Sequence, residues 1–590
     1  MAKITISDKS KIFSIKKWLG LNESQDGDTG LKLGEAAIMR NWRITRDGHL
    51  QIRPGYASVV HLGDSAVAGI WVGFVAGVER LLCACGGHLW NVDVKTWEKT
   101  DLGAVADGGA AFFGFSDRVY ILAGGEYYRW SGTGDLEVVE GYVPIVATAT
   151  QPSGGGTLLE SVNRLTGKKR QQFSPDGSAT VFVLVEADID EIVRVEGTTS
   201  SYTLDKKNGK LTFAAAPPKG TNSLTITWRK GSGDRGKIAA MRFSELFNGA
   251  SDSRVFLYGD GTNTAVYSGI DDTGKATAEY FPSLNEIGFG DANTPVTAMI
   301  RHYDRMMVFK PSSAYSVQYG TMTLADNTTA AAFYASTMNK EIGCEAPGQV
   351  LLVKNNPRTL FGRGVYEWAL AYGATRDERN AKRVSDRVEP TLAGFDLSKT
   401  LTFDDEGRQE YYICCGDNAL VHNYGADAWY YYTNFPVTGM VLIGGEVYFG
   451  TPAGDVMHFS RDYRNDAGED LDAYYESGAM DFDMDWRRKY NSICWASIQP
   501  ESHARVVMTM KSNRKSVYLE RAISSGLATF SHVDFGHFSF GTNRQPQVKR
   551  VRIKVKKFTF STLVFKSKSR SSTATILGVD AQVRYTGNVK

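Results

Sequence analysis

Short apolar segments recur along the middle of the chain, and each is followed by a turn and a second strand that ends in an aromatic residue. Because these segments are apolar at consecutive positions, we expect them to be buried on both faces, like central strands of a blade. Their starts lie roughly 35 to 55 residues apart, with one longer interval, which is the spacing of four-stranded propeller blades. The repeated units span residues 80–90, 118–130, 254–267, 305–317, 358–368, 411–424 and 446–459.

The longer interval, residues 149–235, has a pattern of its own. It begins near the run Pro-Ser-Gly-Gly-Gly at 152–156, which is typical of a linker. Alternating strand patterns follow at 172–184, 205–213 and 224–228, and Asn-Gly and Pro-Pro-Lys-Gly turns separate them. The interval therefore predicts a small β-sandwich inserted in a loop of the propeller.

A hairpin is predicted ahead of the repeats, at 39–56. Apolar and polar residues alternate at 42–44 and again at 50–52, on either side of the turn Asp47-Gly48. Pro54-Gly55 ends the second strand. The preceding residues 1–38 are polar and loosely patterned. They predict an N-terminal arm that is either disordered or ordered against a neighbouring subunit.

A further domain is expected from about residue 481 to the C-terminus. In its segment 551–556, Val551, Ile553 and Val555 face one way, so this strand is half-buried in an antiparallel sheet, most simply a β-sandwich. The side chains that face the other way are Arg550, Arg552, Lys554 and Lys556.

These patterns together predict an all-β fold. The N-terminal arm spans 1–38, the β-propeller is split between 39–148 and 236–480, the inserted β-sandwich spans 149–235, and a basic C-terminal β-domain spans 481–590. Composition agrees, because 61 Gly and 12% aromatic residues suit strands joined by tight turns.

Charge is distributed unevenly along the chain. The formal net charge is +2, but residues 544–590 hold twelve Lys or Arg and one acid, which leaves 55 basic and 64 acidic residues in the rest. Six Cys without framework spacing predict reduced thiols. The sequence shows no secretory signal and no apolar run long enough for a membrane span, so we expect a soluble protein made in a cytoplasm.

Three of these features resemble one family. The opening hairpin, which ends in Arg53-Pro54-Gly55-Tyr56, the inserted domain, and the closing basic, aromatic and Ile-Leu-Gly-Val strands resemble bacteriophage tail nozzle or hub proteins, the tail tubular protein B-like family. The resemblance implies a virion structural protein located in the tail and synthesised in the host bacterial cytoplasm. It also implies a ring of copies, with six-fold symmetry suggested by the family, around the DNA exit channel.

The implied partners follow from that location. They are other copies in the ring, head–tail adaptor or portal proteins, tail fibres or tip proteins, and the viral double-stranded DNA that passes through the channel. The implied mechanism is mechanical: the ring retains DNA and conducts it at ejection. No membrane anchor is expected.

Motifs that would indicate an enzyme are weak. Residues 269–276 nearly match a phosphate-binding loop, but Ala276 replaces the Ser or Thr that would bind Mg²⁺. His532 and His537 are an odd number of residues apart, so they would face opposite ways in a strand. Asp481, Asp483 and Asp485 lack the loop that a Ca²⁺ site needs. We therefore expect no catalytic residues, no cofactor and no metal.

The basic row is the one patch with a physical argument for binding. Arg550, Arg552, Lys554 and Lys556 either keep a solvated sheet face charged or contact an acidic partner, and we favour a neighbouring subunit over DNA. Two rival functions remain. A receptor- or carbohydrate-binding propeller would use exposed aromatics such as Trp429-Tyr-Tyr-Tyr432, and a propeller glycan hydrolase would need a carboxylate pair.

Overall fold

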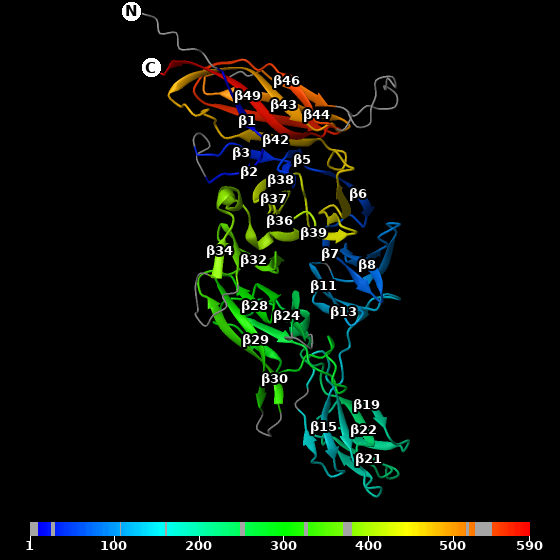
Figure 1. Cartoon of the computed structure of the whole chain (residues 1–590). Coiled ribbons are helices and arrows are strands. Elements are labelled where there is room, and N and C mark those ends of the chain that lie inside the picture. Colours follow the sequence, from blue (N-terminus) through cyan, green and yellow to red (C-terminus); the bar gives the residue numbers. More distant parts are fainter. Residues whose placement is uncertain are drawn as a thin grey trace, which may run out of the picture. The chain divides into compact units, whose positions relative to one another are not determined.

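The computed structural model is almost entirely β-structure (Figure 1). It describes residues 10–24, 30–106, 108–159, 162–247, 254–323, 329–369, 380–514, 519–525 and 545–589. The helical segments of this part are short: α1 (Arg235–Ala239), α2 (Glu389–Leu392) and the 3₁₀ turns η2 (Asp386–Val388) and η3 (Leu397–Lys399). No helix in the described ranges is long and apolar enough to cross a membrane. The all-β fold is confirmed: a β-propeller, an inserted β-sandwich and a C-terminal β-sandwich.

The chain divides into two compact units. The first comprises residues 1–67, 351–369 and 381–590, and the second comprises 68–350 and 370–380. The second unit holds four antiparallel four-stranded blades and the inserted domain. The blade strands are β7 (Val67–Val75), β8 (Val78–Cys85), β9 (His88–Val92), β10 (Lys99–Ala104), β11 (Ala110–Phe115), β12 (Arg118–Ala123), β13 (Glu126–Trp130), β14 (Glu137–Val138), β23 (Phe243–Phe247), β24 (Arg254–Tyr258), β25 (Thr264–Tyr267), β26 (Glu286–Gly288), β27 (Ala298–His302), β28 (Arg305–Lys310), β29 (Ser313–Thr323) and β30 (Thr329–Asn339).

Neighbouring blades of this unit pack face to face. Leu82 and Leu89 of the first blade share a core with Val119 and Ile121 of the second. The second and third blades share another core, and so do the third and fourth. This packing is the reason that the central strands are apolar on both sides, as their sequence predicts.

The inserted domain is a two-sheet sandwich that leaves the second blade by β15 and returns by β22. Its sheets follow the orders β16-β15-β17-β22-β19 and β18-β21-β20. Phe173, Phe182 and Trp228 are fully buried in the core between them. The strands are β15 (Ile145–Thr150), β16 (Thr157–Leu158), β17 (Lys168–Phe173), β18 (Val181–Val183), β19 (Glu191–Glu196), β20 (Tyr202–Asp205), β21 (Lys210–Phe213) and β22 (Leu224–Arg229).

The first unit holds three more blades. The last of them takes three strands from the end of the propeller sequence and its fourth strand from the N-terminal region, because β6 pairs with β41. The blade strands are β31 (Leu351–Val353), β32 (Asn356–Phe361), β33 (Gly364–Trp368), β34 (Ala381–Arg383), β35 (Leu401–Asp405), β36 (Glu410–Cys415), β37 (Asn418–Asn423), β38 (Ala428–Thr433), β39 (Gly439–Ile443), β40 (Glu446–Gly450), β41 (Asp455–Ser460) and β6 (Gly55–His61).

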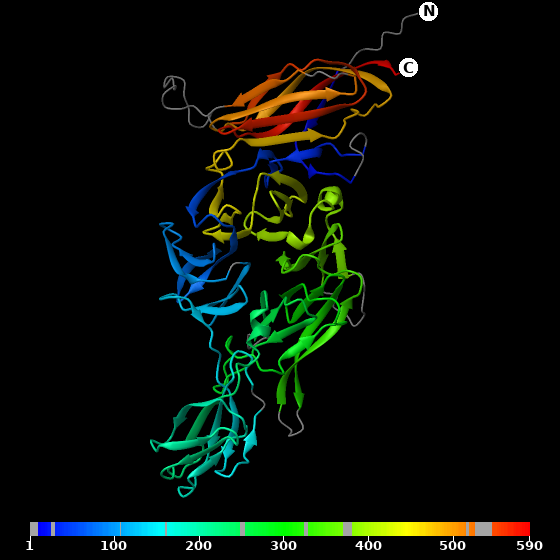
Figure 2. The same ribbon diagram turned by 180° about the vertical axis from the view of Figure 1, so that it is seen from behind.

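The C-terminal domain of the first unit is a sandwich of two sheets, seen from both sides in Figures 1 and 2. One sheet has the order β4-β5-β49-β43-β46, with β1 on β49 and β47 on β43. The other continues from a blade, in the order β35-β36-β37-β38-β3-β42-β48-β44-β45, with β2 on β3. The strands not yet given are β1 (Lys11–Ile15), β2 (Gly20–Leu21), β3 (Glu35–Arg40), β4 (Trp42–Ile44), β5 (Leu50–Ile52), β42 (Leu471–Ser477), β43 (Arg487–Ile498), β44 (Ala504–Ser512), β45 (Arg521–Ser525), β46 (Gln547–Val551), β47 (Val555–Phe558), β48 (Ser561–Ser569) and β49 (Thr575–Asn588).

Two domain boundaries in the structure differ from those predicted from the sequence. The hairpin β4–β5 lies beside β49 in the C-terminal sandwich and not in the propeller, which begins at β6. The C-terminal domain includes β42, which pairs with β48, so it begins near residue 471 and not at 481. In the described part of the N-terminal arm, β1 pairs with β49 of the same chain, so this part is ordered without a neighbouring subunit.

Candidate functional site

The motif Arg53-Pro54-Gly55-Tyr56 surrounds a buried ion pair. The Arg53 and Asp466 side chains are almost fully enclosed, and Arg53 Nη1 and Nη2 donate to the two carboxylate oxygens of Asp466 at 2.8 and 2.6 Å. The remaining donors of Arg53 reach Asn41 Oδ1 at 2.9 Å, the Pro54 carbonyl at 2.8 Å and the Thr433 carbonyl at 3.0 Å. All five N–H groups of the guanidinium are therefore satisfied, as a buried charge requires.

The other residues of the motif make equally close contacts. A Cβ on Gly55 would lie 2.1 Å from the carbonyl oxygen of Asn465, so only glycine fits between these two backbones. The Tyr56 hydroxyl donates to the Asn434 carbonyl at 3.0 Å, and its ring packs edge-on against Phe449. The motif thus fixes the loop after β41 to the beginning of β6.

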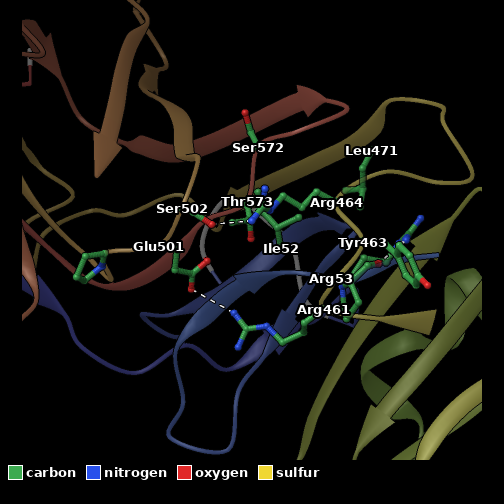
Figure 3. Close-up of a pocket in the computed structure, with 12 residues that line it drawn as sticks. Ile52, Arg53, Arg461, Tyr463, Arg464, Leu471, Glu501, Ser502, Ser572 and Thr573 are labelled. Carbon is green, nitrogen blue, oxygen red and sulfur yellow. Dashed lines mark hydrogen bonds and ion pairs between the residues drawn. The ribbon is translucent and has the colours of Figure 1, made fainter. Parts of the chain in front are cut away.

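Beside this ion pair lies a pocket of about 370 Å³, shown in Figure 3. Its walls come from three places in the first unit: the end of β5 with Arg53 and Pro54, the loop after β41, and two loops of the C-terminal sandwich. We call it the arginine pocket. It is lined by Ile52, Arg53, Pro54, Arg461, Tyr463, Arg464, Leu471, Pro500, Glu501, Ser502, Ser572 and Thr573.

The charged groups of the arginine pocket are incompletely paired. Arg464 Nη2 donates to Ser502 Oγ at 2.6 Å, and within the described residues no carboxylate lies within ion-pair distance of Arg464. Arg461 Nη2 lies 3.3 Å from Glu501 Oε1, and the Arg461 side chain is 55% exposed. The second carboxylate oxygen of Glu501, Oε2, is buried and has no hydrogen-bond partner in the described part of the chain.

A chain of polar contacts holds Glu501 in place. Its Oε1 accepts from the Thr575 hydroxyl at 2.6 Å, and that hydroxyl accepts from Gln51 Nε2 at 2.8 Å. Gln51 Oε1 in turn accepts from Arg43 Nε and Nη2 at 3.0 and 2.8 Å. Arg43 Nη1 lies 4.0 Å from the buried Glu410. The hairpin β4–β5 therefore connects Glu501, which lines the pocket, to Glu410 of the propeller blade.

The predicted basic row lies on the outer strand of the seven-stranded sheet. Val551, Ile553 and Val555 are buried, and the four cations Arg550, Arg552, Lys554 and Lys556 are exposed, so the predicted alternation is confirmed. The strand is interrupted, however. Val551 and Val555 are four positions apart, but their partners on β43, Cys494 and Asn491, are only three positions apart, so one residue is extra. Asn491 Nδ2 donates to the Ile553 carbonyl in this bulge at 3.0 Å.

The neighbouring strands extend this basic face. Tyr490 on β43 lies between Lys556 and the exposed Arg584 on β49. The one acid of the C-terminal 47 residues, Asp580, is held by Lys16 Nζ at 2.9 Å. None of the four predicted cations forms an ion pair with another described residue. The structure thus presents a cationic sheet face, and its partner stays a prediction.

Other candidates from the sequence have structural roles. Residues 269–276 form a turn in which Asp271 Oδ1 accepts from the backbone of Thr273 and Lys275, and no helix follows. Asp481 caps its own turn by accepting from the backbone N–H of Asp483 at 3.0 Å. No group of His, Cys, Asp or Glu in the described ranges has the geometry of a metal site. His532 and His537 lie outside those ranges.

The aromatic run at 429–432 is not an exposed platform. Trp429, Tyr430 and Tyr432 are buried in β38, and only Tyr431 is partly exposed. The Tyr412 and Tyr430 hydroxyls both donate to Glu410 inside the blade. The expectation that this run is an exposed aromatic cluster is therefore wrong, and the carbohydrate-binding alternative stays a prediction without these residues. The side chains of this run are buried because the strand has blade or sandwich structure on both faces.

Sequence reasoning missed both the ion pair and the arginine pocket. Arg53 and Asp466 are 413 residues apart, and no local pattern connects them. The sequence signal that could have indicated the pair is Arg53 directly after the apolar strand 50–52, because an Arg that is buried there requires a carboxylate partner.

Comparisons with known proteins indicate no family. No family model and no curated protein matches the chain. Among solved structures, a chain of the mitotic checkpoint complex matches with 8% identity, 69% coverage of this chain, 94% of that chain and a TM-score of 0.33. The computationally designed Ika8 protein matches with 11% identity, 69% and 99% coverage and a TM-score of 0.32. The AfRom2 CNH domain matches with 8% identity, 69% and 97% coverage and a TM-score of 0.31.

Proposed function

We propose that this protein is a structural component of a bacteriophage tail. It forms the nozzle or hub as a ring of copies below the head–tail adaptor, and the ring surrounds the DNA exit channel. The observation that carries the proposal is the order of parts along the chain: an opening hairpin, a propeller, a sandwich inserted in one blade connection, and a basic C-terminal sandwich. This is the order that the sequence resemblance implies.

The construction of the first unit supports a mechanical role. The last blade receives its fourth strand from the N-terminal region, and the Arg53–Asp466 pair joins the same two segments. The hydrogen-bonded order of one sheet continues from a blade through β3 into the C-terminal sandwich. Such cross-connections resist separation of the parts, which is what a ring under DNA pressure needs.

The basic face suits contact between subunits better than contact with DNA. Phosphate neutralisation by cations gives affinity for DNA and slows its movement, so a channel wall should not present such a row. The part of the chain before residue 544 has an excess of acidic residues, so the same face on one copy can meet an acidic surface on the next.

The location is tested by immunogold electron microscopy of particles from the source culture, with an antibody against this chain. We expect gold at the tail, directly below the capsid. Label on cells or in the soluble fraction, with unlabelled particles, would refute the virion role and favour a free binding protein. The purified chain provides a second test, because negative-stain images should show rings.

A further inference from the structure

Arg464 of the arginine pocket has no carboxylate within ion-pair distance among the described residues. Arg53, Arg358 and Arg408 of the same unit each have a carboxylate within ion-pair distance. Arg464 is only partly exposed, and its one hydrogen bond to a side chain goes to the neutral Ser502 hydroxyl. Because a guanidinium has five donors, most of those on Arg464 are left for another acceptor.

The rest of the lining fits the same kind of ligand. Ser502, Ser572 and Thr573 supply side-chain hydroxyls, and Tyr463 supplies a partly exposed aromatic ring. Figure 3 shows Arg461 and Arg464 reaching toward the loops that carry these hydroxyls. The Arg461 side chain is 55% exposed, and its ion pair with Glu501 spans 3.3 Å, so it can turn to a ligand at little cost.

Glu501 restricts the ligand further. Arg53 is neutralised by Asp466, so the remaining charges of the pocket are those of Arg461, Arg464 and Glu501, with a net formal charge of +1. This balance suits a single carboxylate, whereas a phosphate group of higher charge would be repelled by Glu501.

We propose that the arginine pocket binds an acidic residue of a peptide segment. The carboxylate of an Asp or Glu accepts from Arg464 and Arg461. The pocket volume of about 370 Å³ is at the small end for ligand sites, which fits one such residue with its flanking backbone. This inference concerns the isolated chain and does not depend on the role in a virion.

Saturation-transfer NMR on the purified full chain tests the proposal, with N-acetyl-Gly-Asp-Gly-amide as the probe. We expect a Kd on the order of 1 mM, because few contacts and a small ligand limit the affinity. The Asn counterpart of the peptide should bind at least about tenfold more weakly, since it lacks the charge that strengthens a hydrogen bond to Arg. Inorganic phosphate should also bind more weakly than the Asp peptide.

Matched variants locate the binding. Arg464→Gln should weaken the Asp peptide about tenfold, the loss of one charge-assisted contact. Arg570→Gln makes the same change of charge in a nearby loop, where Arg570 faces Asp470 outside the pocket, and should leave binding unchanged. Arg461→Gln provides a second variant if Arg464→Gln does not fold, as judged by circular dichroism.

Several results would overturn the proposal. These are no binding of the Asp peptide at about twenty times the expected Kd, equal binding of the Asn peptide, or equal losses in Arg464→Gln and Arg570→Gln. Tighter binding of phosphate than of the Asp peptide would overturn it as well, in favour of a general anion site. Each result is independent of where the protein is found in a particle.

Discussion

The Arg53–Asp466 pair allows a quantitative test of how the first unit is held together. Asp466→Asn keeps the size of the side chain and removes its charge, which leaves a guanidinium that is fully buried without an anion. Breaking a buried pair in this way typically costs about 3–5 kcal/mol, and the two short bonds to Asp466 place this pair in that range. In a unit of this size, about 1 kcal/mol lowers Tm by roughly 2–4 °C, so we expect a decrease on the order of 10 °C.

The assay is differential scanning calorimetry, combined with hydrogen exchange of β6 and β41. The unfolding transition of the first unit should move down, and exchange of β6 should accelerate, because the pair joins its start to the loop after β41. The double variant Arg53→Met with Asp466→Leu should recover part of the loss, since apolar side chains of similar size need no partner. The matched control is Glu520→Gln, whose partner Lys566 lies 2.7 Å away in an exposed pair and whose loss should cost less than about 1 kcal/mol.

The reasoning would be refuted by an Asp466→Asn variant that unfolds within about 1 kcal/mol of the wild type, like the exposed control. It would also be refuted by a double variant that is as unstable as the sum of the two single variants. In that case the two charges would not act on each other.

Further predictions concern other residues. Burial raises the pKa of Glu245 from 4.5 to about 7, so its contribution to stability is fully present below about pH 4.5 and is lost as pH rises through 7. Glu245→Gln should therefore be more stable than the wild type by about 1–3 kcal/mol at pH 8 and equally stable at pH 4. Calorimetry across this pH range measures the difference. Gly55→Ala should destabilise the first unit by more than about 2 kcal/mol in urea unfolding, because its Cβ would lie 2.1 Å from the Asn465 carbonyl oxygen. The control Gly587→Ala, with nothing within 4 Å of its added Cβ and no positive φ, should cost about 1 kcal/mol or less. Trp228→Ala should destabilise the inserted sandwich by about 3–5 kcal/mol, with unchanged melting of the first unit, because the indole is fully buried in that core. The triple change of Arg550, Arg552 and Lys554 to Ser should weaken assembly of rings in light scattering and negative stain, and unaltered assembly would remove the subunit role of the basic face.

The parts of the fold that depend on local periodicity could be predicted from sequence. The alternation of Val551, Ile553 and Val555 with cations requires only that one sheet face be buried, and the structure has it. Asp47-Gly48 specifies a turn by backbone conformation alone, and the hairpin forms there, with Gly48 at a φ of 81°.

The parts that depend on pairing between distant segments could not be predicted in this way. The hairpin at 42–52 has the same alternation whether it lies on a blade or beside β49, so its sequence did not distinguish the propeller from the C-terminal sandwich. By composition, an exposed cluster and a buried strand are equally compatible with Trp429, Tyr430 and Tyr432. These side chains are buried because other structure packs on both faces of their strand, which the local sequence does not specify. The arginine pocket combines loops from three regions of the chain, each unremarkable alone.

The pairing of β6 with β41 has a consequence for synthesis on the ribosome. β6 is complete by residue 61, but its partner strand is not made until residues 455–460 have been translated. Throughout that interval the nascent chain has an unpaired strand near its beginning and, later, a three-stranded blade with an open edge, and both are prone to pair with other chains. Closing a loop of this length also makes the final pairing slow. The last blade is therefore the step at which crowded expression should divert molecules into aggregates, and slower translation or lower temperature should raise the yield of folded protein.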